Sequence, residues 1–360
     1  MAETFTLEGS LEDVFQKFID EGWSDGLPMM PPTEEAVADI LRYTDRAPDD
    51  PMPPLAPNRN DSTVHAVAVN AVMAGCRPEY FPVVLAACDA IAEPDFNLYG
   101  IQATTNPVAV MIMVNGPIAQ ELGFNGAGNC FGPGIRANAT VGRAVRLAMI
   151  NIGGAAPRTM DKATAGSPGK YTMCIAENEA ESPWEPYHVE RGFALETSTV
   201  SAFSTTGTQN VLDLASRKAW GILRTFASAC ATVGHQNVQL GGGPTIAFCP
   251  EHAEILAEGG FSKDDVRRAL YETSRVPTKD FPPETLNGMV RHRRPRYFGT
   301  EHPDGAVPLA DSPEEIQIVV AGGPGPHSMV MPSFGEATMV PIRPIATKTG
   351  EPVSSVNDFL

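Results

Sequence analysis

Residues 245–260 read TIAFCPEHAEILAEGG, a short β-branched and aromatic run followed at once by a helical pattern. We predict a buried strand over TIAFC and a helix that begins at Pro250, because proline suits the first helical position. Residues 262–275 predict a second helix capped by Ser262, and IQIVV at 316–320 predicts a second strand. Alternation of strand and helix is typical of α/β folds, so we expect one in this half of the chain.

The first half of the chain shows the same mixture of apolar runs and Gly, Pro and Asn turns. PVAVMIMV at 107–114 predicts a strand, 135–150 predicts a helix, and 170–179 predicts a further strand. We therefore expect a mixed, multi-layer α/β fold with Gly-rich strand-to-helix loops and two subdomains. The expected division is an N-terminal helical and Pro-rich arm over residues 1–60, a first α/β domain over 61–200 and a second α/β domain over 201–360.

The boundary between the two α/β domains is expected in the Ser/Thr-rich segment TSTVSAFSTTGTQ, residues 197–209. After it, Asn210 is expected to cap a long helix that runs to about residue 233 and is lined by Leu214 and Phe226. Near the start of the chain, Ser10 predicts the N-cap of an amphipathic helix.

Composition and charge exclude several classes of function. The 360-residue chain carries 26 basic and 43 acidic residues, a net charge of −17, which repels nucleic acid and anionic membrane surfaces. It has no apolar leader and no apolar run of about 18 residues, so we expect a cytoplasmic protein. The six cysteines are scattered singly, which predicts reduced and mostly buried thiols.

A glycine-rich loop at residues 125–138 reads NGAGNCFGPGIRAN and leads into a predicted helix. Glycine leaves backbone N–H groups open to a ligand, and a helix N-terminus adds partial positive charge, so the loop suits a small anion. A plain packing turn is the alternative. The pattern matches neither the dinucleotide fingerprint nor the P-loop, so no nucleotide is implied. The candidate substrate-binding residues are Asn125, Asn129, Cys130, Gly132, Gly134, Arg136, Asn138 and Arg143.

A second glycine loop, AGGPGPHS at 321–328, follows the predicted strand IQIVV. Ligands collect at the carboxyl ends of strands in open α/β sheets, so Gly323, Gly325, His327 and Ser328 are further candidates for substrate binding. The two prolines remove backbone donors, which favours the alternative of a turn with no ligand.

Two cysteines lie where a helix dipole can lower a thiol pKa: Cys130 in the first loop, and Cys249 at the junction FCPEH. His252 stands three residues after Cys249, a spacing that can pair a thiolate with an imidazolium. Cys249 and His252 are therefore catalytic candidates. The alternative is that both thiols are inert core residues, since cysteine is among the most buried residue types.

Charged residues gather between 158 and 191, and Lys170, Glu177 and His188 are acid/base candidates there. Glu177 with His188 also leaves a divalent metal open as a cofactor, although no known metal motif is present. Ordinary surface ion pairs are the alternative. The basic run RHRRPR at 291–296 suits either an anion gate or pairing with acidic surface, in its own fold or in another subunit of an expected homo-oligomer.

Five stretches carry a resemblance to a known family: EGWSDGLPMMPPT, NAVMAGCRPEYFP, FGPGIRANATVGRA, PGKYTMCIAENEAESPWEPYHVERGF and AGGPGPHS. Together they resemble a bacterial family associated with UGSC-motif (seleno)proteins. The resemblance implies an enzyme or an enzyme subunit without naming a reaction. The sequence has no Cys-Gly-Ser-Cys, so thiol redox chemistry of that sort implies a UGSC-type partner protein.

Three functions follow from these residues. The first is an enzyme for a small anionic metabolite, a lyase or hydrolase with Lys170, Glu177 and His188 as acid/base groups, because no nucleotide, flavin or phosphoryl-transfer signature is present. The second is a subunit of a thiol-dependent reductase that uses Cys249 or Cys130. The third is a non-catalytic binding protein for a small molecule.

Overall fold

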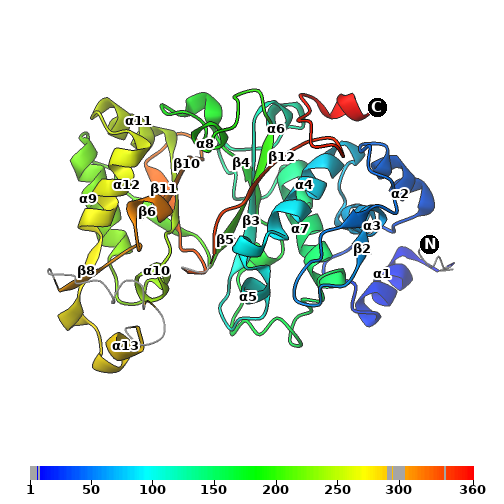
Figure 1. Ribbon diagram of the computed structural model, residues 1–360, viewed down its shortest axis with the longest axis horizontal. Coiled ribbons are helices and arrows are strands. Elements are labelled where there is room, and N and C mark those ends of the chain that lie inside the picture. The colour runs from blue at the N-terminus through cyan, green and yellow to red at the C-terminus, as the bar shows by residue number, and fades with distance from the viewer. Residues whose placement is uncertain (1–5, 7–8, 290–293, 295–304, 336–337) are drawn as a thin grey trace.

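The computed structural model describes the chain except for residues 1–5, 7–8, 290–293, 295–304 and 336–337. Helices make up 40% and strands 15% of a mixed α/β fold, which confirms the predicted fold class. Figure 1 shows four layers across the long axis: helices, a sheet, a second sheet and further helices.

The first sheet has four strands in the order β12-β5-β3-β4. β3 pairs parallel with β4 and antiparallel with β5, and β12 adds antiparallel to β5. Helices α3, α4 and α7 cover its outer face through a core that includes Ile112 and Val114 of β3. The elements are β3 Ala109–Asn115, β4 Cys174–Ala176, β5 Thr199–Thr205, β12 Ile342–Pro344, α3 Val64–Ala74, α4 Phe81–Ile91 and α7 Arg136–Asn151.

The second sheet has four strands in the order β10-β7-β11-β6. β7 and β10 are parallel, whereas β11 runs antiparallel to β7 and to β6. Helices α9, α11 and α12 cover its outer face, packed on Ile246 and Phe248 of β7. The elements are β6 Gln209–Leu212, β7 Thr245–Phe248, β10 Gln317–Val320, β11 His327–Met331, α9 Ala219–Cys230, α11 Pro250–Glu258 and α12 Lys263–Thr273.

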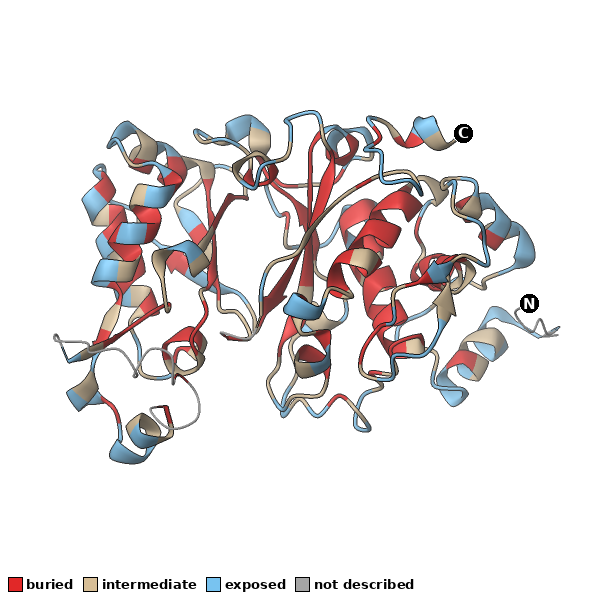
Figure 2. Cartoon of the chain, in the orientation of Figure 1, coloured by how far each residue is buried: buried red, intermediate tan, exposed pale blue. Residues whose placement is uncertain are grey.

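The two sheets face each other across a third apolar core. It contains Met111 and Phe203 from the first sheet and Ala247 and Val319 from the second. The ring of Tyr187 lies 5.6 Å from that of Phe203, between the sheets. The central strands β3, β5 and β7 are consequently buried on both faces, and Figure 2 shows them largely in red.

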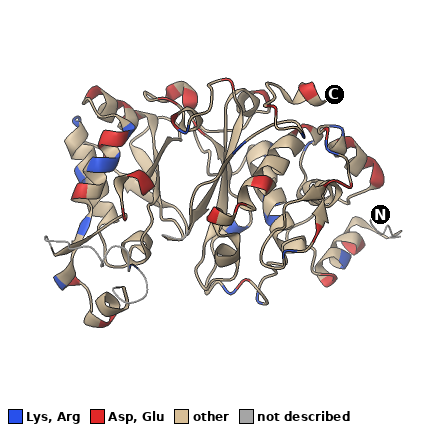
Figure 3. Ribbon diagram, in the orientation of Figure 1, with Lys and Arg blue, Asp and Glu red and all other residues tan. Residues whose placement is uncertain are grey.

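Shorter elements complete the chain. Ser10 caps α1 with a capping box, as predicted, and Ser262 does the same for α12. Lys and Arg residues lie mainly in the outer layers, and the sheets between them carry few charged residues (Figure 3). The remaining elements are α1 Leu11–Asp20, α2 Glu34–Leu41, α5 Leu98–Gln102, α6 Pro117–Glu121, α8 Tyr187–Glu190, α10 Gln236–Leu240, α13 Pro283–Gly288, β1 Pro51–Met52, β2 Ser62–Thr63, β8 Arg275–Pro277 and β9 Ala306–Pro308.

The prediction for residues 197–233 was wrong about the helix. The Ser/Thr-rich segment expected to be a boundary contains β5, a fully buried strand of the first sheet, and ends where β6 of the second sheet begins. Asn210 does not cap a helix: it lies within β6, paired with Met329, and the helix begins only at Ala219. The cross-strand partner is more than a hundred residues away, so local sequence preference did not decide this segment.

The strand predicted over 170–179 is shorter than expected, because only Cys174–Ala176 pair with β3. Lys170 lies instead in a 3-10 turn, Pro168–Lys170. No helix in the part of the chain that the structure describes is both long and apolar enough to cross a membrane.

The carboxyl ends of the parallel strands meet at one edge of the molecule. β3 and β4 end there together, as do β7 and β10. The backbone N–H of Asn178, just after β4, donates to the carbonyl of Val320 at 2.8 Å and so joins the two sheets at that edge. Ligands collect at this end of parallel strands, and several predicted site residues lie along it.

Candidate functional site

Cys249 is placed by the strand-to-helix junction that decides the fold. It follows β7 directly and is the N-cap of α11, with Pro250 at the first helical position. The pattern in TIAFCPEH produces this arrangement because a β-branched strand ends where proline starts a helix. Cys249, His252 and Ser328 are each no more than 1% exposed.

A single hydroxyl group ties Cys249 to His252. The Oγ of Ser328, on β11, accepts the backbone N–H of Cys249 at 2.9 Å and lies 2.8 Å from Nδ1 of His252. The other ring nitrogen of His252, Nε2, lies 3.3 Å from the carbonyl oxygen of Asp213. The imidazole is therefore held on both sides, one helical turn from the thiol.

The electrostatics of this trio bring the pKa values of Cys249 and His252 closer together. Burial acts to raise the pKa of the Cys249 thiol, but hydrogen bonds from His252 and Ser328 outweigh it and leave the pKa below its ordinary value. Burial acts to lower the pKa of His252, but the hydrogen bonds and negative charges of Cys249 and Asp213 together outweigh that effect, so its pKa is raised. Opposite shifts of this kind stabilise a thiolate beside an imidazolium.

The two glycine loops lie against each other beside this trio. Gly322 donates its N–H to the carbonyl of Gly126 at 2.8 Å. A Cβ on Gly323 would stand 2.8 Å from the Cα of Gly128, and one on Gly126 would stand 2.6 Å from the carbonyl oxygen of Ala176. At these positions glycine permits close backbone contact, which accounts for part of both loops by packing alone.

Asparagine side chains hold the first loop from within. Asn138 accepts the N–H of Asn125 at 2.9 Å and donates to the carbonyls of Asn125 and Cys130. Asn129 donates to the carbonyl of Pro133 at 2.9 Å. These predicted binding groups are therefore engaged with the loop's own backbone. Gly132 and Gly134 lie in its exposed part.

Cys130 differs from Cys249 in its environment. Its side chain is buried in the core between the sheets. Burial raises the pKa of Cys130 to about 11, and only backbone hydrogen bonds oppose the effect. No imidazole contributes to that shift, so this thiol is protonated at neutral pH.

The two arginines predicted to bind an anion hold other segments in place. Arg136 donates through Nε to the carbonyl of Gly75 at 3.0 Å. Arg143 forms a bidentate ion pair with Asp25, at 2.7 and 2.8 Å, and donates to the carbonyl of Pro28. Arg143 thus fastens the N-terminal arm to α7.

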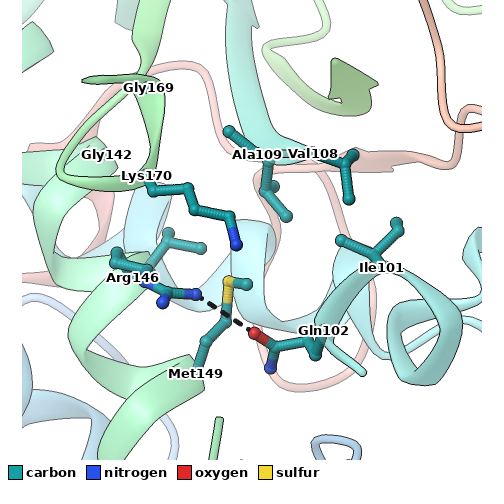
Figure 4. Close-up of a pocket in the computed structure, with 11 residues that line it drawn as sticks. Ile101, Gln102, Val108, Ala109, Gly142, Arg146, Met149, Gly169 and Lys170 are labelled. Carbon is teal, nitrogen blue, oxygen red and sulfur yellow. Dashed lines mark hydrogen bonds between the residues drawn. The ribbon is translucent and has the colours of Figure 1, made fainter. Parts of the chain in front are cut away.

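Lys170 lies away from the other catalytic candidates. It donates to both carboxylate oxygens of Asp161, at 2.8 and 2.7 Å, and Asp161 also accepts from Arg146. Lys170 and Arg146 border a void of about 10 Å³, room for one water molecule (Figure 4). The neighbouring Gly169 packs on Ala109, at the start of β3. Glu177 lies at the other end of β3, where its N–H donates to the carbonyl of Val114. The length of the strand, about 20 Å, therefore separates Lys170 from Glu177.

Glu177 and His188 are brought into one buried cluster. The amide of Asn115, at the end of β3, donates to Glu177 Oε2 at 2.6 Å and to Glu179 Oε1 at 2.8 Å. Nδ1 of His188 lies 3.9 Å from that same oxygen of Glu179, and its Nε2 lies 3.3 Å from the carbonyl of Leu195. Asn115 and Glu179 therefore link Glu177 to His188.

The cluster continues to Lys263, at the start of α12. Its Nζ lies 3.8 Å from Glu177 Oε1 and 3.1 Å from Glu190, which also pairs with Arg267. Burial raises the pKa of Glu177, and the opposing charge of Lys263 is the next largest influence. A buried carboxyl with a raised pKa is suited to carry a proton.

The other candidates have less specific surroundings. His327 is exposed, and its Nδ1 lies 3.1 Å from Oδ1 of Asn210. Gly325 accepts the N–H of His327 at 3.0 Å within the turn before β11. Arg294 is fully buried against Asp311, and the rest of the basic run 291–296 lies outside the described residues.

Metal binding finds no support at Glu177 and His188. Among the residues that the structure describes, no group of three or more His, Cys, Asp or Glu side chains is arranged to hold a metal ion.

Sequence reasoning missed the partners that give these residues their properties. Asp213 and Lys263 have no motif around them, and Lys263 resembles a surface lysine at a helix start. The spacing of Cys249 and His252 was readable, but the place of Ser328 beside them depends on β11 pairing with β7.

Comparison with known proteins gives no indication of function for this chain. No family model and no curated protein matches this sequence. The site's own geometry therefore carries the argument.

Proposed function

We propose that this protein is a thiol-dependent hydrolase in which Cys249 is the nucleophile and His252 the acid/base group. The observation that carries the proposal is the position of Ser328 Oγ, 2.9 Å from the N–H of Cys249 and 2.8 Å from Nδ1 of His252. Ser328 thereby orients the imidazole and the backbone at Cys249, and a base that a third group holds beside a nucleophile is the arrangement that activates a thiol for acyl transfer.

The reaction follows from the charged pair. The Cys249 thiolate attacks the carbonyl carbon of a small acyl substrate, and the leaving group takes a proton from the His252 imidazolium as its bond to carbon breaks. Neutral His252 then takes a proton from water, whose oxygen attacks the thioester. Release of the acid product restores the thiolate and the imidazolium.

The start of α11 suits the charge that develops in this reaction. Pro250 lacks an N–H, whereas the N–H groups of Glu251 and His252 belong to the first turn, where a helix has no internal acceptor for them. Such N–H groups stabilise an oxyanion that forms beside the N-cap residue.

Trapping the acyl-enzyme tests the proposal. The protein is incubated with p-nitrophenyl acetate, quenched in acid, and digested for peptide mass spectrometry. We expect an acetyl group on the peptide that contains Cys249, and none in Cys249→Ser. Cys130→Ala, which removes the other candidate thiol, should keep the adduct. An adduct confined to other residues, or no adduct, contradicts the proposal.

A second candidate function uses the same thiol. All six cysteines are free and buried, so a thiol-dependent reductase would need its second thiol from a partner or a small-molecule thiol. The lowered pKa of Cys249 suits disulfide exchange as well as acyl transfer. A mixed disulfide with glutathione that forms faster at Cys249 than the acetyl adduct does would favour this function over hydrolysis.

A further inference from the structure

A hollow of about 490 Å³ opens between the edge strand β6 and α9. Its walls come from Asn210 and Val211 on one side and from Arg224, Thr225 and Ser228 on the other. This volume lies within the range of about 300–1,000 Å³ that small-molecule sites occupy.

Arg224 gives the hollow a positive charge. Its exposed guanidinium makes no ion pair or side-chain hydrogen bond with any residue that the structure describes. In a chain with a net charge of −17, carboxylates are abundant, yet none of the described ones is paired with this arginine. The nearby carboxylate of Asp213 accepts hydrogen bonds from the hydroxyl of Thr225, at 2.7 Å, and from Ser216.

Neutral hydrogen-bond donors beside Arg224 add to the groups that can bind an anion. Ser228 contributes a hydroxyl group to the same face of α9. Asn210 faces Nδ1 of His327 through its oxygen, at 3.1 Å, which leaves its NH₂ group as a donor. A planar guanidinium with amide and hydroxyl donors is the chemistry that recognises a carboxylate or a phosphate.

The hollow is connected to the proposed catalytic residues by direct contacts. Thr225, in its wall, donates to the carboxylate of Asp213, whose carbonyl oxygen lies 3.3 Å from Nε2 of His252. The ring of Phe226, the next residue of α9, lies 6.0 Å from the His252 ring. One turn of α9 thus contributes both to the wall of the hollow and to the packing around the buried His252.

We propose that this hollow binds the anionic end of the substrate, with Arg224 as its charge partner and Ser228 and Asn210 as neutral donors. The inference rests on the proposed role of Cys249, because it makes the hollow the recognition subsite of that reaction. The substrate class is then a small acyl compound that bears a carboxylate or phosphate group.

Two alkylating reagents that differ only in charge test the inference. The rates at which iodoacetate and iodoacetamide modify Cys249 are measured by peptide mass spectrometry and expressed as a ratio, relative to the ratio for N-acetylcysteine. We expect the ratio to favour iodoacetate in the wild type and to fall about tenfold in Arg224→Gln, because one charge-assisted contact is lost. Iodoacetamide should react equally with both.

Arg217→Gln is the matched control, since Arg217 is an exposed arginine near Asp213 that bonds only the carbonyls of Leu214 and Ser216. It removes the same charge and should leave the ratio unchanged. An equal fall in both variants, or no fall in Arg224→Gln while iodoacetamide still modifies Cys249 readily, overturns the subsite. Slow reaction of Cys249 with both reagents overturns the proposed function instead.

Calorimetric titration with malonate and with inorganic phosphate tests the hollow without reference to Cys249. We expect the wild type and Cys249→Ser to bind at least one of these anions and Arg224→Gln to bind it about tenfold more weakly. The anion that binds distinguishes a carboxylate from a phosphate substrate. Equal binding by the wild type and Arg224→Gln contradicts the inference.

Discussion

Cys130 and Cys249 occupy comparable places in the chain and have opposite properties. Each is buried and each stands near the N-terminal end of a helix, α7 or α11. Burial raises the pKa of Cys130 to about 11, whereas the pKa of Cys249 lies below its ordinary value. The difference lies in His252 and Ser328, which act on the pKa of Cys249 and are absent from the influences on Cys130.

The largest effect is expected from His252→Ala. Without the imidazole, burial dominates at Cys249, and its thiol pKa should rise toward the behaviour of Cys130. The alkylation rate of Cys249 at pH 7 should fall by at least about tenfold, because each pKa unit changes the thiolate population tenfold. Peptide mass spectrometry after timed alkylation measures the rate.

His252→Gln is the control for packing, because the amide can still bond Ser328 while it carries no charge. It should slow alkylation as strongly as His252→Ala and leave the thermal midpoint closer to that of the wild type. Undiminished alkylation in both variants would remove the distinction between the two junctions.

A smaller effect is expected from Ser328→Ala. The backbone N–H of Cys249 would lose its acceptor in the interior, which should lower the free energy of unfolding by about 1–3 kcal/mol. The alkylation half-point of Cys249 should also rise. Ser201→Ala is the matched control, since its hydroxyl is buried in β5 with no hydrogen-bond partner among the described residues. Urea titration compares the two, and equal losses would contradict the role of Ser328.

Glu177→Gln tests the raised pKa of Glu177, which lies at the end of β3 near the loop that carries Cys130. Burial raises the pKa of Glu177 above 4.5, so the folded protein holds this proton more tightly than the unfolded chain. Its stabilising effect is therefore complete below pH 4.5 and is lost as the pH rises through the raised value. Urea titrations across this window should show a decline in wild-type stability that Glu177→Gln reduces.

Glu254→Gln, an exposed carboxylate on α11, should retain the full decline. The same slope in all three proteins would mean that Glu177 has an ordinary pKa. The thiol half-point of Cys249 should not respond to Glu177→Gln, because burial, His252 and Ser328 are the main influences on the pKa of Cys249.

The smallest effect is expected from Cys130→Ala. The change removes one buried sulfur atom and should cost about 1 kcal/mol of stability. The alkylation half-point of Cys249 should stay the same, as measured on the peptide that contains it. A change in that half-point would show that the two junctions are coupled.

The sequence predicted the fold where structure is local. The strand and helix at 245–260 and the Ser262 cap follow from short-range patterns, and the structure has both. β6 was missed because its pairing with β11 depends on a partner more than a hundred residues away. Asn210 favours a helix cap in isolation, and the sheet overrides that preference.

The candidate site was predictable to a similar extent. Cys249 and His252 were found because they lie one helical turn apart, and both glycine loops were found by composition. Lys170 was grouped with Glu177 by nearness in sequence, yet the two lie at opposite ends of β3. The partners of a charged side chain depend on how strands pair, which no local pattern contains.

The most direct test is the pH dependence of alkylation at Cys249 and Cys130, measured in one sample of native protein by peptide mass spectrometry. The account predicts a half-point for Cys249 below that of an ordinary thiol, about 8.5, and a half-point for Cys130 well above it. Equal half-points, or one for Cys249 at or above that of an ordinary thiol, would contradict the assignment of Cys249 as the nucleophile.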